Sequence, residues 1–197
     1  FVLVLNQSPG ASVSVIDVGE RRVASEIQTQ GCAGVFPAGP DRFGMLCGDG
    51  TVMSVHLAKD GALDHIARSE CFFDPVVDPV TEKGARDGQT WRFVSFEGVL
   101  HEVDFSGDAP RVSASWSLLS DGERAEGWRV GGAQHVAYHP GTQRFYSIVH
   151  EGGPGSHKDP GAEIWVYDVA AKKKVEVFDA PNLIPAFLGP QAGFEAD

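Results

Sequence analysis

Residues 13–18 read Val13-Ser14-Val15-Ile16-Asp17-Val18, an alternating stretch that is typical of a β-strand ending in a turn. Three further stretches repeat the phrase: Val52-Met53-Ser54-Val55-His56-Leu57, Leu100-His101-Glu102-Val103-Asp104-Phe105 and Ile164-Trp165-Val166-Tyr167-Asp168-Val169. Their fifth residues stand at positions 17, 56, 104 and 168, which gives spacings of about 39, 48 and 64 residues. A recurrence near 40 to 50 residues is typical of β-propeller blades. We therefore predict an all-β fold of about four consecutive four-stranded antiparallel blades, with loops accounting for the widening intervals.

The segments between the repeated phrases also predict strands, as expected for four-stranded blades. Residues 42–47 and 51–57 flank Gly48-Asp49-Gly50, and residues 91–96 and 99–105 flank Glu97-Gly98; both arrangements predict β-hairpins. A third hairpin, residues 144–149 and 163–169, contains a long insertion at residues 150–161, and such loops are often functional or mobile. Outer strands are expected at residues 22–28, 63–69, 111–116 and 174–178. Ser120 and Glu123 have capping-box spacing and predict a single short helix.

The two ends of the chain differ in character. Residues 1–5, Phe-Val-Leu-Val-Leu, predict a buried strand, and a start in mid-strand indicates a piece of a longer polypeptide. Four blades barely reach the smallest closed propellers, so a segment of a larger propeller fits better. We assign residues 1–180 to propeller blades. Residues 181–197 contain three prolines and are predicted to be a divergent tail or the start of a further blade.

Composition excludes two classes of partner. The 197 residues are 42% hydrophobic and 22% charged, as in ordinary folded domains. The net charge of −11 argues against nucleic acid, because phosphate binding requires a basic surface. No apolar run approaches the roughly 18 residues of a transmembrane helix, so no membrane partner is expected.

The cysteines leave two interpretations open. Cys32 and Cys47 are expected to face each other on adjacent strands of one blade, either as a disulfide or as two buried thiols. A disulfide that closes about 15 residues would stabilise the fold by roughly 3 kcal/mol. Cys71, next to Phe72 and Phe73, is predicted to be a packed core thiol.

The remaining polar residues point to a scaffold. His135 and His139 are expected on one face of one strand, and His150 and His157 in the long loop, but no further ligand joins either pair at zinc spacing. The recurring aspartates at positions 17, 104 and 168 are predicted to bond turn amides. The sequence contains neither Gly-x-Ser-x-Gly nor a glycine-rich phosphate loop. We therefore predict no catalytic, cofactor-binding or metal-binding residue on this chain.

Several phrases together resemble the heavy subunit of the quinoprotein amine dehydrogenases. They are Cys47-Gly48-Asp49-Gly50, Asp104-Phe105-Ser106-Gly107-Asp108, Trp116-Ser117-Leu118-Leu119, Trp128-Arg129-Val130-Gly131-Gly132 with Val136-Ala137-Tyr138-His139, and His157-Lys158 leading to Ala162-Glu163-Ile164-Trp165-Val166. The first two look closer to the aromatic (aralkylamine) enzyme, and the tryptophan turn closer to the methylamine enzyme. The similarity runs from residue 1 to about residue 178.

The resemblance implies a seven-bladed propeller of which this chain covers about the middle four blades. It implies a periplasmic α2β2 assembly in which a small, disulfide-rich light subunit carries tryptophan tryptophylquinone and the catalytic base. Substrates would be primary amines, most closely aromatic ones, oxidised to aldehyde and ammonia. Electrons would pass to a blue-copper protein such as azurin or amicyanin. Cys32 and Cys47 match the family's paired cysteines, so the resemblance favours the disulfide.

Two other functions remain open at this stage. A free-standing propeller could serve as a protein-binding module, as repeat arrays do. A propeller enzyme could instead hold its own cofactor at a central channel. Under the heavy-subunit hypothesis this chain is non-catalytic, and aromatic residues of irregular segments, Trp128 and Tyr138, are the candidate subunit contacts.

Overall fold

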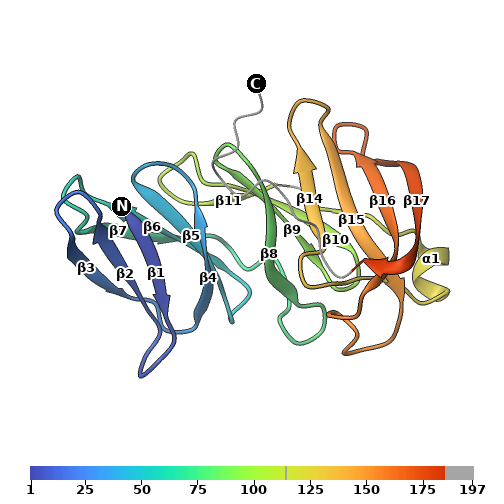
Figure 1. The fold of residues 1–197 in the computed structure, drawn as a ribbon, viewed down its shortest axis with the longest axis horizontal. Helices are drawn as coiled ribbons and strands as arrows, with labels where there is room; N and C mark the ends of the chain where they lie inside the picture. The colour runs from blue at the N-terminus through green and yellow to red at the C-terminus, as the bar shows by residue number, and fades with distance from the viewer. Residues whose placement is uncertain (114, 185–197) are drawn as a thin grey trace. The chain divides into compact units, whose positions relative to one another are not determined.

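The computed structural model describes residues 1–113 and 115–184, which form β-sheets and a single short helix (Figure 1). These residues divide into two compact units. The first unit comprises Phe1–Glu82, Arg86–Arg92 and residues 102–113. The second unit comprises Lys83–Ala85, Phe93–His101 and residues 115–184. None of the helices among the described residues is both long and apolar enough to cross a membrane.

Four sheets follow one another along the chain, and consecutive strands pair within each sheet. The first sheet has the order β1 (Val2–Asn6), β2 (Ser12–Asp17), β3 (Arg22–Gln28). The second has the order β4 (Cys32–Pro37), β5 (Arg42–Cys47), β6 (Val52–Leu57), β7 (Leu63–Arg68). The third contains β8 (Val80–Asp87), β9 (Thr90–Ser95), β10 (Val99–Asp104), β11 (Arg111–Val112) and β12 (Trp116–Ser117). The fourth contains β13 (Trp128–Val130), β14 (Val136–His139), β15 (Arg144–Glu151), β16 (Gly161–Asp168) and β17 (Lys173–Ile184).

The two five-stranded sheets are four-stranded blades in which one strand is split. Both β11 and β12 pair with β10, the first opposite Val103 and Asp104 and the second opposite Val99 and Leu100. In the same way β13 and β14 pair with successive parts of β15. The strand expected at residues 111–116 is therefore two short pieces. The predicted all-β fold of consecutive antiparallel sheets is confirmed.

The repeated phrase occupies the same strand in every sheet. Its four copies fall on β2, β6, β10 and β16, each of which precedes the last strand of its sheet. The register of β2 with its neighbours buries Val13 and Val15 completely, which is what alternation predicts for a strand with one covered face. The phrase thus marks the structural repeat of the chain.

Two predictions about the strands need correction. Strand β1 is buried on one face only: Leu3 and Leu5 pack against the core cluster of the first unit, whereas Val2 (48% exposed) and Val4 (40% exposed) alternate with them and lie on the other face. Strand β17 continues to Ile184, beyond the expected end at residue 178. It includes Pro181, which an edge strand tolerates because its outer side needs no amide donor. The rest of the predicted tail, residues 185–197, lies outside the described residues, and the boundary at residue 180 stays a prediction.

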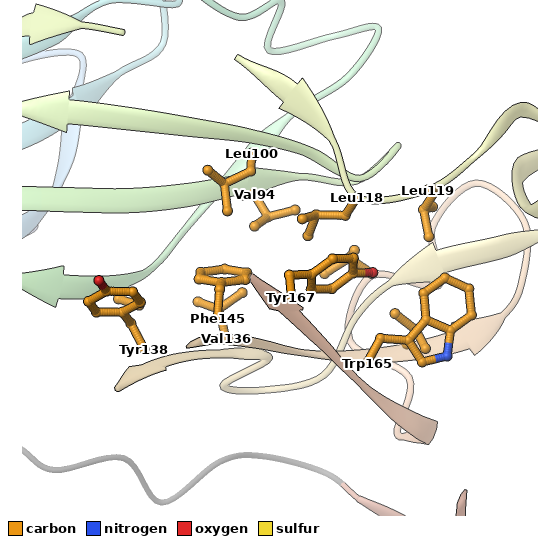
Figure 2. Packing of buried hydrophobic residues seen from close by; sticks show 12 residues of the cluster. Val94, Leu100, Leu118, Leu119, Val136, Tyr138, Phe145, Trp165 and Tyr167 are labelled. Carbon is orange, nitrogen blue, oxygen red and sulfur yellow. The ribbon is translucent and has the colours of Figure 1, made fainter. Parts of the chain in front are cut away.

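Each unit has its own hydrophobic core. The first unit buries a cluster built around Val13, Val15, Phe43, Met45 and Val55. In the second unit, Val94 and Leu100 of the third sheet point toward Phe145 and Tyr167 of the fourth (Figure 2). Helix α1 (Asp121–Ala125) begins at Ser120 with the predicted capping box, in which the Ser120 and Glu123 side chains bond each other's backbone amides.

Candidate functional site

The recurring aspartates close turns, as predicted. One carboxylate oxygen of each accepts a hydrogen bond from a backbone N–H just after its strand: Asp17 from Glu20 (3.0 Å), Asp104 from Ser106 (2.8 Å) and Asp168 from Ala171 (2.9 Å). These bonds lower the pKa of Asp104 and of Asp168. The carboxylates at the repeat positions are therefore structural groups.

The second sheet has a histidine at the same place. His56 lies 3.1 Å from the hydroxyl of Ser54, and its ring stacks on His65 with centroids 4.0 Å apart. His65 in turn contacts Asp64 and Asp108, each at 2.9 Å. Burial lowers the pKa of His56, whereas the hydrogen bond that His65 donates to the Asp64 carboxylate raises the pKa of His65. The pair therefore places a ring that is less readily protonated against one that is more readily protonated.

The cysteines occupy two different environments. Cys32 of β4 lies directly opposite Cys47 of β5, and the two form a disulfide with a sulfur–sulfur distance of 2.08 Å. The disulfide interpretation is thus confirmed over two buried thiols. Cys71 is exposed, so its prediction as a core thiol is wrong. The reason is that its segment lies over the Gly48–Gly50 turn, where the Phe72 N–H donates to the Gly50 carbonyl (3.0 Å).

The structure separates His135 from His139, the pair that was expected on one face of a strand. His135 precedes β14 and is 2% exposed, while His139 at its end is exposed, so the two do not share a face. His150 belongs to strand β15, because that strand extends two residues beyond its predicted end. Among the described residues no cluster of three or more histidine, cysteine, aspartate or glutamate side chains could hold a metal ion.

The candidate contact residues lie in strands of the second unit, not in irregular segments. Trp128 opens β13 and its ring packs against Trp165 with centroids 5.1 Å apart. Tyr138, in β14, is 9% exposed and belongs to the core cluster of Figure 2. Trp128 is partly buried at the edge of this cluster. Their role as subunit contacts stays a prediction.

The connections at one end of the sheets form a recurrent structure that the sequence did not reveal. Within each unit, backbone hydrogen bonds join a hairpin turn to a neighbouring connection between sheets: Gly48 N–H to Gly31 O (2.8 Å), Phe72 N–H to Gly50 O (3.0 Å), Leu118 N–H to Gly98 O (2.8 Å) and Gly152 N–H to Gly127 O (2.9 Å). The loops at this end are therefore fixed in place by their backbones. Two of them, residues 69–79 and residues 152–160, are long enough to present a surface.

A surface aspartate fixes the loop at residues 69–79. One oxygen of Asp74 accepts the N–H groups of Val76 (2.8 Å) and Val77 (3.0 Å), and the Asp78 N–H donates to the Asp74 carbonyl (3.0 Å). These bonds lower the pKa of Asp74. Asp74-Pro75 is a turn signal that could have predicted this arrangement.

A buried histidine fixes the loop at residues 152–160. His150 is 4% exposed, and its Nε2 lies 2.8 Å from the Ser156 hydroxyl. The Gly132 N–H donates to the carbonyl of His157 (3.1 Å). Burial lowers the pKa of His150, and Arg129 lowers it further against an opposing effect of Asp159. No sequence pattern pointed to this anchor, because it depends on glycine at position 131: a Cβ there would lie 2.3 Å from the imidazole.

The model of the methylamine dehydrogenase heavy chain family matches residues 1–187. The chain belongs to this family. It is 27% identical over 179 residues to the methylamine dehydrogenase heavy chain of Methylorubrum extorquens, covering 90% of this chain and 43% of the relative. It is 29% identical over 154 residues to that of Paracoccus versutus, covering 77% and 35%.

The present chain therefore covers less than half of the length of these curated heavy chains. The likeness confirms a heavy subunit of the quinoprotein amine dehydrogenases, and it does not separate the aromatic-amine branch from the methylamine branch.

Solved structures support the propeller fold alone. The β-propeller domain of Myceliophteria thermophila Cps50 (Swd1) superposes with a TM-score of 0.58 at 10% identity, covering 92% of this chain and 53% of that one. Chaetomium thermophilum Raptor gives a TM-score of 0.58 at 12% identity, covering 96% of this chain and 16% of that one. The fold of the chain is therefore that of the β-propeller proteins.

Proposed function

We propose that this chain is part of the non-catalytic heavy subunit of an amine dehydrogenase that oxidises primary amines to aldehyde and ammonia. The match of the heavy-chain family model to residues 1–187 carries the proposal. Aromatic amines are the proposed substrates, on the phrases at residues 47–50 and 104–108 that resemble the aralkylamine enzyme. The complete heavy subunit would be a seven-bladed propeller.

The quinone is proposed to belong to a partner. Tryptophan tryptophylquinone would accept the electrons of the amine on a small light subunit of an α2β2 assembly and deliver them to a blue-copper protein such as azurin or amicyanin. On this chain, Trp165 is 3% exposed, packs against Trp128 and has the Lys174 ammonium 3.3 Å above its ring. A tryptophan enclosed in this way is unsuited to meet a substrate. The proposal therefore assigns this chain a supporting role.

A periplasmic location is part of the proposal. The Cys32–Cys47 disulfide supports it, because such bonds persist in oxidising compartments.

The experiment that tests the proposal is co-production of the heavy chain with the light subunit encoded by the same organism. The expected result is a single heterotetrameric species by light scattering, with quinone absorbance that bleaches when an aromatic amine is added. Repeating the absorbance measurement with methylamine in place of the aromatic amine distinguishes the aromatic-amine branch of the family from the methylamine branch. Separate elution of the two chains would contradict the proposal and would favour a free-standing propeller.

Trp128 provides a second, local test. It lies at the edge of its cluster, so Trp128→Ala is expected to weaken association with the light subunit more than Tyr138→Phe, a change in the core. Isothermal titration of both variants, after their thermal stabilities are compared, measures the difference. Equal affinities would remove Trp128 from the interface.

A further inference from the structure

The turn at residues 74–78, which we call the valine turn, presents the two most exposed large apolar side chains of the described residues. Val76 is 88% exposed and Val77 is 77% exposed. Single exposed apolar residues are ordinary on protein surfaces. Two adjacent valines in one turn place two apolar side chains in water, and covering them with another surface is favourable.

The valine turn is also fixed in its shape. The Asp74 carboxylate accepts the N–H groups of both valines, at 2.8 and 3.0 Å, and the Asp78 N–H closes the turn onto the Asp74 carbonyl (3.0 Å). A surface that is ordered before binding loses less conformational entropy on association. The valine turn is therefore ordered before any partner binds.

An apolar hollow lies beside the valine turn. It has a volume of about 440 Å³ and is lined by Asp49, Cys71, Phe72, Phe73, Asp74 and Pro75. The Phe72 and Phe73 rings meet edge to face with centroids 4.9 Å apart. A projection next to an aromatic hollow can interlock with a partner that has the complementary shape, which is the usual arrangement at the centre of a protein interface.

Charge selects the kind of partner. The carboxylates of Asp49, Glu70 and Asp74 lie in the hollow, in the valine turn or in the segment leading to it. Arg68 lies near them, and its guanidinium contacts Asp49 at 3.4 Å. A second copy of this chain would bring the same acids against these and would be repelled. A partner with lysine or arginine around an apolar patch would be attracted.

We propose that the valine turn and its hollow dock the light subunit, on an apolar patch of that subunit bordered by basic residues. This inference rests on the proposed function, because it requires that the chain pairs with a light subunit.

The test measures binding of the heavy chain to the purified light subunit of the same organism by isothermal titration. The double variant Val76→Ser/Val77→Ser removes the apolar projection without adding charge. Its matched control is Val18→Ser, because Val18 is 61% exposed in the turn that follows β2. The double variant is expected to raise the Kd at least about 10-fold, with Val18→Ser unchanged. Both should melt like the unsubstituted chain.

A second pair of variants tests the role of the acidic residues. Glu70→Lys is expected to raise the Kd several-fold and to reduce the dependence of binding on salt, whereas Glu20→Lys, at another exposed position of the same unit, should do neither.

Three results would overturn the inference while the proposed function stands. The first is a double variant that binds the light subunit with unchanged affinity. The second is an isolated heavy chain that dimerises through the two valines. The third is a double variant that keeps the light subunit and loses electron transfer to the blue-copper acceptor, which would make the acceptor the occupant. If the unsubstituted chain fails to bind the light subunit, the proposed function itself is wrong.

Discussion

The loops at residues 69–79 and 152–160 are fixed by opposite means. His150 fixes the second loop from inside, at 4% exposure, so the loop carries its anchor in the protein interior. Asp74 fixes the first loop from the surface and thereby directs Val76 and Val77 outward. The difference shows that one loop is ordered by a buried side chain and the other by a carboxylate on the surface. Sequence length and glycine content do not separate these cases.

The largest expected effect is reduction of the Cys32–Cys47 disulfide. The disulfide closes a loop with a sequence separation of 15 residues, which stabilises the folded state by roughly 3 kcal/mol in the chain-entropy model. Cys32→Ala/Cys47→Ala should therefore lower the free energy of unfolding by about that amount. Because Cys47 directly precedes the turn on which the loop at residues 69–79 rests, amide exchange in this loop should rise more than in residues 152–160. Cys71→Ala, which removes a thiol outside the disulfide, is the control for the free energy of unfolding. An equal rise in both loops would remove the distinction between them.

Replacing the internal anchor should have the next largest effect. His150→Ala removes a buried ring and the hydrogen bond between that ring and the Ser156 hydroxyl. The free energy of unfolding is expected to fall by about 2 kcal/mol. His157→Ala, in the same loop but exposed, should change stability little. Urea denaturation measures both. Similar losses for the two variants would show that burial of His150 is not what holds the loop.

The two loops should also respond differently to pH. Burial lowers the pKa of His150 in the folded chain below the ordinary value of 6.5. As the pH falls, His150 therefore binds a proton more readily in the unfolded chain than in the folded chain. The free energy of unfolding is highest above about pH 6.5 and decreases progressively below that pH. Limited proteolysis at pH 7.5 and 5.5 should show faster cleavage of residues 152–160 at the lower pH. Asp74, whose pKa is lowered from 3.8, stays ionised throughout, so the loop at residues 69–79 should not change.

The smallest expected effect is local. Asp74→Ala removes the acceptor of two backbone amides on the surface, so amide exchange of Val76 and Val77 should accelerate while the melting temperature stays nearly constant. Asp74→Asn keeps an acceptor oxygen and should restore part of the protection. If Asp74→Ala leaves exchange at these amides unchanged, the valine turn is not fixed by its carboxylate.

The fold was accessible from the sequence because each local signal agreed with the global repeat. The repeated phrase, whose fifth residue is Asp17, Asp104 or Asp168 in three of its copies, marks one strand per sheet, and the same carboxylates close the turns. Strand β8 was not predicted, because its charged residues Glu82, Lys83, Arg86 and Asp87 interrupt the alternation of apolar and polar residues that is typical of a strand. The environments of His150 and Cys71 were also missed. Both are set by distant glycines, at positions 131 and 50, whose close approach no local pattern encodes.

The central claim is that this chain supports an amine dehydrogenase without performing its chemistry. The most direct measurement is dye reduction with an aromatic amine as donor, using purified heavy chain alone and then with the light subunit added. The account predicts no amine-dependent reduction by the heavy chain alone and activity that appears in proportion to the light subunit. Amine-dependent reduction by the heavy chain free of any partner would contradict it.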